Sequence, residues 1–138
     1  MNFLSLSALR LPRSRLSLIL VLIAIHSFVA GLGLIIRPAM LMKFFGFSND
    51  YERFFPTQGG VFHVVMAIGY TMAALNVDYY RCLIYFSIIV KIIATIFLFI
   101  YYFVMDSKWI VLASGIGDGL MALLIFLALF SYDRSAKN

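Results

Sequence analysis

The sequence predicts an all-α membrane protein, a bundle of four transmembrane helices with an amphipathic interfacial segment between the first and second. Hydrophobic residues make up 64% of the chain and charged residues only 12%, against about half and a quarter in soluble domains. The mean hydropathy is +1.01. Four apolar windows each reach the roughly 20 residues that cross the hydrocarbon core of a bilayer. Little chain is left over, so residues 1–138 are expected to form a single integral membrane domain.

The predicted spans are the four apolar windows, which end at charged, polar or helix-breaking residues. They cover residues 16–36, 56–77, 82–105 and 109–132. The basic N-terminus before the first window resembles a secretory signal. However, the window is longer than the apolar core of a signal peptide, and Phe28 disrupts the small-residue cleavage pattern. We therefore expect the first span to be retained.

The connection between the first two spans is long and largely apolar. Pro38 should end the first helix, because it lacks a backbone donor and biases Arg37 away from the helical conformation. The apolar residues that follow are expected to lie in the membrane interface, with Lys43 extending toward the phosphates. They are Met40, Leu41, Phe44, Phe45 and Phe47. This segment is expected to act as a flap over the outer mouth of the bundle.

The other two connections, NVDYYR and DSK, are short turns. Spans two, three and four should therefore be antiparallel neighbours. Glycines in spans one, two and four are expected to let helix backbones approach closely.

Basic residues are dispersed at the ends of the spans, with six on the N-terminal side of the membrane and four on the other. This distribution is typical of a membrane protein and predicts that both termini are cytoplasmic. A nucleic-acid surface would cluster its positive charge instead. The lipid bilayer is the expected partner, and nucleic acid is not.

Two charged residues lie near the middle of predicted spans. Lys91, in SIIVKIIATI, has Ser87 and Thr95 one helical turn away on either side. These three residues form a polar stripe that should face the bundle interior. Asp118, in SGIGDGLMAL, has Ser114 one turn before it.

An ion pair between Lys91 and Asp118 follows from the DSK turn. Folding the fourth span back on the third leaves Asp118 about 6 Å along the axis from the level of Lys91, within reach of a lysine side chain. One unpaired charge at a helix centre costs about 2.5–3.5 kcal/mol, which favours pairing. Two interpretations stay open: a neutralised pair that fixes helix register, or the charged lining of a ligand or proton site.

The histidines and the cysteine do not predict a cofactor. His63 is a candidate for the interior polar cluster, but its helix offers no second metal ligand three or four residues away. His26 lies deeper in its span than His63, which disfavours a haem held between them. The single cysteine, Cys82, excludes an internal disulfide and a cysteine cluster. No metal site and no catalytic motif such as GxSxG or HExxH is recognised, so an enzyme is not favoured.

A second group of polar residues flanks the predicted outer mouth. The second span opens with PTQGG, which places Gln58 there, and Arg37 and Arg53 lie nearby. Arginines at this position favour an anion or a lipid headgroup over a cation as a ligand. Ordinary interfacial anchoring explains them as well.

Several segments carry a resemblance to a known family. They are GLGLIIRPAMLMKFFGF, QGGVFHVVMAIGYTMAAL, IIVKIIAT and GDGLMALLIF, within residues 16–132. Through them the chain resembles the broad DoxX-like group of small four-helix bacterial membrane proteins, including its DUF4345-type relatives. The resemblance implies a bundle in the bacterial inner membrane, and some members of the group are subunits linked to quinone or sulfur-compound oxidation. Relatives often have arginine where the second span begins, whereas this chain has Gln58.

Three roles follow for the chain. The first is a non-catalytic accessory or structural subunit of a larger membrane complex, favoured by the shortage of catalytic groups. The second is a ligand-binding or proton-coupled membrane protein with an interior pocket. The residues of that interior cluster are Lys91, Asp118, Ser87, Thr95, Ser114 and His63. The third, a quinone-linked redox subunit, rests on the resemblance alone.

Overall fold

The structure, a computed structural model, describes residues 14–47, 53–105 and 107–135. Within these residues, the regular secondary structure is helical. Four long helices are α1 (Arg15–Ile36), α3 (Phe54–Leu75), α4 (Arg81–Val104) and α5 (Trp109–Ser135), and a short α2 (Ala39–Phe44) follows α1. Each long helix has the length and apolar composition needed to cross a membrane. The predicted all-α fold with four spans is confirmed, and the helix bounds differ from the predicted spans by at most three residues.

Local sequence signals set both ends of α1. The Ser14 hydroxyl accepts a hydrogen bond from the Ser17 amide at 3.1 Å, as expected of an N-cap. At the other end, the following proline disfavours the right-handed helical region for Arg37. Arg37 adopts a left-handed conformation with φ of 50°, which is common where a helix ends. Its amide donates to the Gly33 carbonyl at 2.9 Å. The chain then turns into α2.

The long helices form two close pairs, α1 with α3 and α4 with α5. In the first pair, Gly31 and Gly60 face each other so closely that a Cβ on either would lie 2.7 Å from the carbonyl oxygen of the other. In the second pair, Gly115 packs against Phe99 and Leu98. Small residues allow this approach in both pairs. The main partner of α3 is therefore α1, and its contact with α4, expected from the short turn, is limited.

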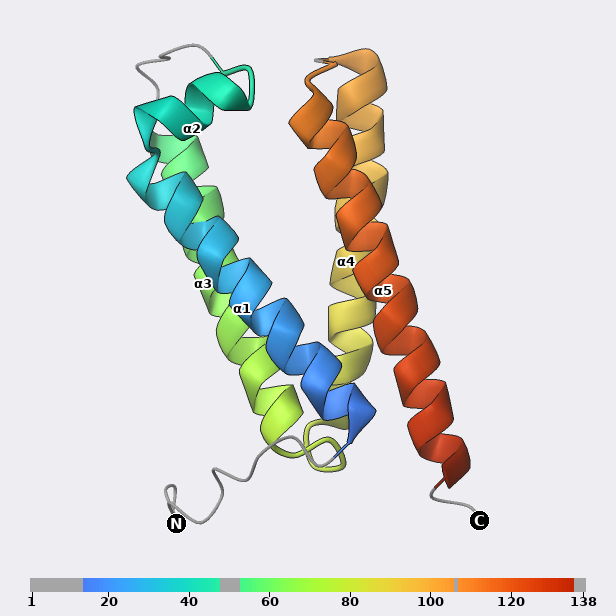
Figure 1. Cartoon of the computed structure of the whole chain (residues 1–138). Coiled ribbons are helices and arrows are strands. Elements are labelled where there is room, and N and C mark those ends of the chain that lie inside the picture. Colours follow the sequence, from blue (N-terminus) through green and yellow to red (C-terminus); the bar gives the residue numbers. More distant parts are fainter. Residues whose placement is uncertain (1–13, 48–52, 106, 136–138) are drawn as a thin grey trace.

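The buried hydrophobic core lies at one end of the bundle. It comes from the first halves of α1 and α4, the second halves of α3 and α5, and the turn between α3 and α4. Its members are Leu16, Leu20, Ile23, Ala24, Tyr70, Ala73, Ala74, Val77, Ile84, Ile125 and Leu129. All four helices meet here, next to the turn between α3 and α4, and the two pairs diverge toward the α2 end (Figure 1).

Polar side chains join the helices at the core end. Arg81, the first residue of α4, forms an ion pair with Asp133 near the end of α5. The Tyr132 hydroxyl donates to Asp78 Oδ2 at 3.0 Å, which ties α5 to the turn between α3 and α4.

At the opposite end, α2 connects the two helix pairs. The rings of Phe44 and Phe45 lie 5.5 and 5.9 Å from the Trp109 ring in edge-on arrangements. The Lys108 ammonium lies 5.1 Å from the centre of the Phe47 ring. The segment expected over the outer mouth is thus a short helix that follows α1 (Figure 1) and contacts the first turn of α5 through its aromatic side chains.

Candidate functional site

The centre of the candidate site is an ion pair between α4 and α5. The Lys91 ammonium donates a hydrogen bond to Asp118 Oδ1. The two side chains are 4% and 13% exposed, so the pair is shielded from the surroundings of the bundle. The short connection between α4 and α5 sets the register that brings the two residues together.

The hydroxyls of the predicted polar stripe bond to their own helix. Ser87 is buried and donates to the Leu83 carbonyl at 2.6 Å. Thr95 donates to the Lys91 carbonyl at 2.8 Å and packs against Gly119, the neighbour of Asp118. Both hydroxyl protons are therefore used within α4, although the residues share the face of Lys91.

Tyr70 of α3 completes the surroundings of the pair and was missed from the sequence. The Lys91 ammonium lies 5.9 Å from the centre of the Tyr70 ring, a cation–π distance. Tyr70 follows His63 by seven residues and so shares its helix face. That spacing was the available signal, but a tyrosine within an apolar span resembles ordinary core.

The Tyr70 hydroxyl has no hydrogen-bond partner among the described residues. Within that part of the chain, no fully buried side-chain nitrogen or oxygen lacks a partner. Tyr70 as a whole is 1% exposed. Because its hydroxyl lacks a partner and so is not among the fully buried atoms, the small exposed part of Tyr70 includes the hydroxyl. The site thus contains one almost fully buried polar group without a hydrogen-bond partner among the described residues.

His63 is held from α1 by Ser27, a second residue that the sequence did not indicate. The Ser27 hydroxyl donates to the His63 carbonyl at 3.0 Å and lies 3.3 Å from His63 Nδ1. The Ser27 hydroxyl has one proton, which it donates to the carbonyl, so it accepts the proton of His63 Nδ1 in the second contact. In the neutral ring, His63 Nε2 is then an acceptor. His63 is within electrostatic range of both Lys91 and Asp118.

Ser114, also expected in the interior cluster, is exposed. It lies one turn from Asp118 on the same face of α5, toward the α2 end. On α3, Gly59 lies one turn from His63 in the same direction, and a Cβ added there would meet no atom within 4 Å. Both positions lie where the helix pairs diverge, so the structure does not bring Ser114 into the buried cluster.

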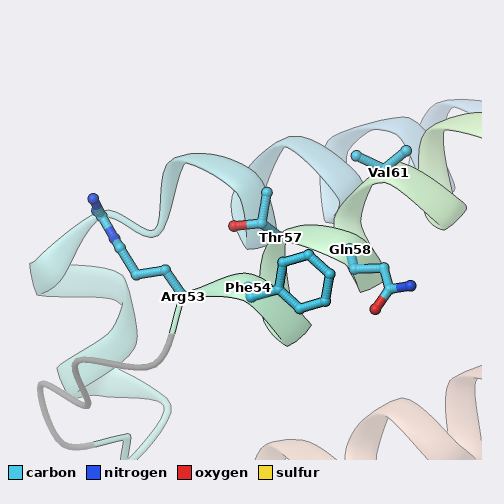
Figure 2. Close-up of a pocket in the computed structure, with 5 residues that line it drawn as sticks. All are labelled: Arg53, Phe54, Thr57, Gln58 and Val61. Atoms are coloured by element: carbon cyan, nitrogen blue, oxygen red, sulfur yellow. The ribbon is translucent and has the colours of Figure 1, made fainter.

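The residues predicted at the outer mouth fall into two places. Arg53 and Gln58 line a cavity of about 370 Å³ at the start of α3, together with Phe54, Thr57 and Val61 (Figure 2). Arg37 caps α1 and is not part of its lining. None of the interior cluster residues lines this cavity either.

Within the described residues, no group of three or more His, Cys, Asp or Glu side chains could hold a metal ion. His26 is exposed on α1, whereas His63 is half-buried and hydrogen-bonded to Ser27. Cys82 is an exposed thiol. The arrangement can offer a ligand an ammonium, a carboxylate, an imidazole nitrogen and a phenol.

Comparisons of the chain with protein-family models, curated proteins and solved structures find no match. The resemblance to DoxX-like and DUF4345-type proteins therefore stays a prediction. The fold itself defines a small multi-pass membrane protein with four candidate spans, in contact with the lipid bilayer.

Proposed function

We propose that the protein binds a membrane-dissolved molecule at its interior polar cluster. The observation that carries this proposal is the buried Lys91–Asp118 pair with the Tyr70 ring beside it, whose hydroxyl has no hydrogen-bond partner among the described residues. Ionisable residues inside a membrane are costly, and they commonly mark ligand, ion or proton sites.

The cluster has unused hydrogen-bonding capacity. An ammonium has three protons, and Asp118 accepts one of those of Lys91. The Tyr70 hydroxyl can donate or accept a hydrogen bond, and His63 Nε2 can accept one. A ligand that enters the cluster can therefore form hydrogen bonds there while the ion pair stays intact.

The ligand class follows from the charge balance and from the surroundings of the cluster. Because Lys91 and Asp118 neutralise each other, a charged ligand would compete with one partner and leave the other uncompensated. The core closes one end of the bundle, and α2 bridges the other through Trp109. These features support an apolar molecule with one uncharged hydrogen-bonding group that enters sideways from the lipid.

The test uses Tyr70→Phe, which removes the hydroxyl and keeps the ring. The protein is purified in native lipid discs, and retained small molecules are identified by native mass spectrometry and lipid extraction. We expect wild-type protein to retain a stoichiometric apolar molecule that Tyr70→Phe loses, with the folded yield unchanged. Thr71→Val is the matched control, since its hydroxyl bonds to its own helix at the Ala67 carbonyl. Equal retention by all three proteins, or no retained molecule in wild type, contradicts the proposal.

A second candidate function is an accessory or structural subunit of a membrane complex. It is supported by the self-neutralised pair and by the hydroxyls of Ser87 and Thr95, which are used within α4. In that case the pair would only fix the register of α4 and α5. Gentle purification from the native membrane would then yield a stoichiometric partner protein, which a variant lacking only one residue of the pair would release.

We further propose, from the distribution of basic residues and the family resemblance, a bacterial inner membrane location with both termini inside. Arg10, Arg13 and Lys137, which contribute to that distribution, lie outside the described residues. The native thiol of Cys82, exposed at the core end, provides a topology probe. A membrane-impermeant maleimide should label Cys82 in inverted vesicles but not in intact spheroplasts. In a Cys82→Ser background, Ser107→Cys should show the reverse pattern; labelling of Cys82 from outside refutes this orientation.

A further inference from the structure

His63 on α3 lies at the level of the Lys91–Asp118 pair. The turn between Leu75, the last residue of α3, and Arg81, the first of α4, folds the two helices back on each other. By helix rise, His63 is then within about 3 Å of the level of Lys91 along the bundle axis. Both charges of the pair lie within electrostatic range of the His63 ring, and the two helix pairs diverge in this half of the bundle (Figure 1). A ligand group that enters between the pairs at this level has the imidazole on α3 and the ion pair on α4 and α5 as bonding partners.

The Ser27 hydroxyl determines which ring nitrogen of His63 has the proton. Ser27 is buried on α1, donates to the His63 carbonyl at 3.0 Å and lies 3.3 Å from His63 Nδ1. Its one proton is used in the first bond, so the second contact requires a proton on Nδ1, and Nε2 of the neutral ring is an acceptor. Without Ser27, the two tautomers could exchange, and Nε2 could equally present a donor.

The unused capacity of the cluster includes acceptors as well as donors. Among the described residues, His63 Nε2 and Asp118 Oδ2 have no hydrogen-bond partner, and the Lys91 ammonium has two further protons. A ligand group that only accepts, such as a ketone or an ester, would bond to Lys91 but leave both acceptors without a proton, which is unfavourable in a buried site. A hydroxyl is the smallest group that both donates and accepts.

We propose that the molecule bound at the interior cluster is an apolar alcohol, whose hydroxyl donates to His63 Nε2 and accepts from Lys91, with Ser27 as the positioning residue. This inference rests on the function proposed above and narrows its ligand from any uncharged polar group to a hydroxyl. The hydrocarbon portion of the alcohol extends toward the α2 end, where a Cβ added at Gly59 would meet no atom within 4 Å.

The test offers 2-hexadecanol and 2-hexadecanone together, at equal mole fractions, to the full chain in phosphatidylcholine discs. The two probes have the same carbon chain and differ in whether the oxygen has a proton. The discs are kept at about pH 8, where an ordinary imidazole is neutral. The retained probes are extracted from the released protein and quantified by gas chromatography. Wild type should retain the alcohol about tenfold over the ketone, the usual effect of leaving a buried acceptor without its partner.

The role of Ser27 is tested with two matched substitutions on α1. Ser27→Ala should bring the retention ratio of the two probes close to one, because His63 Nε2 can then donate to the ketone. The control is Ser17→Ala, which removes another buried hydroxyl of α1, one that donates to the Ala74 carbonyl of α3 at 2.6 Å. This control should leave the retention ratio unchanged.

The tautomer of His63 is measured separately by nitrogen NMR of histidine-labelled protein, with His26→Gln to assign the signals. Wild type should have a protonated Nδ1 and an unprotonated Nε2. Ser27→Ala should show a mixture of the two tautomers, a change that a purely packing role of Ser27 would not produce. If Ser27→Ala does not fold, His63→Gln replaces it in the retention test and should also lose the preference, since its amide can turn to present a donor or an acceptor.

The outcomes separate this inference from the function on which it rests. Equal retention of the two probes by wild type, a preference for the ketone, or a proton on His63 Nε2 overturns the inference alone. An equal effect of Ser27→Ala and Ser17→Ala on the retention ratio overturns it as well. Retention of both probes no higher than in Tyr70→Phe contradicts the function proposed for the cluster, and the inference with it.

Discussion

Replacing either Lys91 or Asp118 alone should destabilise the bundle more than replacing both. The side chains are 4% and 13% exposed, so the pair belongs with buried ion pairs rather than with weak surface pairs. Removing one partner of such a pair costs about 3–5 kcal/mol, because the other charge is left buried and uncompensated. Lys91→Met and Asp118→Asn should each cost an amount in this range.

The double variant, Lys91→Met with Asp118→Asn, removes both charges and should lie within about 1–2 kcal/mol of wild type, since a buried pair contributes little net stability. The coupling energy of the cycle should therefore be at least about 4 kcal/mol, above the range of about 0.5–3 kcal/mol that is usual for pairs in contact. The free energy of unfolding can be followed in mixed micelles by circular dichroism. If a single variant does not fold, the folded yields of the three variants give the same ranking.

Additivity would refute this reasoning. If the cost of the double variant equals the sum of the single costs within about 0.5 kcal/mol, the two side chains do not interact. The cycle also separates the two candidate functions. A purely structural pair predicts that the double variant regains all properties of wild type, whereas a binding site predicts a stable protein that no longer retains its ligand.

Three further predictions concern packing and the ends of the bundle. Gly60→Ala should destabilise the bundle by about 1–3 kcal/mol through overpacking. Gly59→Ala, at a position with open space around it, should be neutral or slightly stabilising. Equal unfolding free energies of the two variants would contradict the close crossing of α1 and α3. Trp109→Ala should speed amide exchange in α2 at least about fivefold, since aromatic pairs contribute about 0.5–1.5 kcal/mol each. Phe103→Ala, which removes an exposed ring that packs on Tyr102, should not. Arg81→Gln should change stability less than Lys91→Met, because its pair with the α5 end is partly exposed; the reverse order would be inconsistent with the burial of the two pairs.

The helices and the central ion pair could be predicted because they depend on local properties of the chain. Apolar windows bounded by charged residues define the spans. The short DSK connection fixes how α5 folds back on α4, so the pairing of Lys91 with Asp118 follows from helix rise alone.

The contributions from other helices could not be predicted in the same way. Ser27 and Tyr70 reach the site from α1 and α3, and their positions depend on how the two helix pairs cross. The Gly31–Gly60 contact sets that crossing in the first pair, and one sequence does not reveal which glycines will meet. The same divergence leaves Ser114 exposed, although helical spacing places it beside Asp118.

The ion pair is contained within a single hairpin, and this has a consequence for how the protein enters the membrane. Lys91 and Asp118 are 27 residues apart in sequence, and only a short turn separates their helices. Their charges can therefore neutralise each other as soon as α4 and α5 lie side by side, before either helix meets α1 or α3. During synthesis, the α4–α5 hairpin carries its own charge compensation and can insert as one unit.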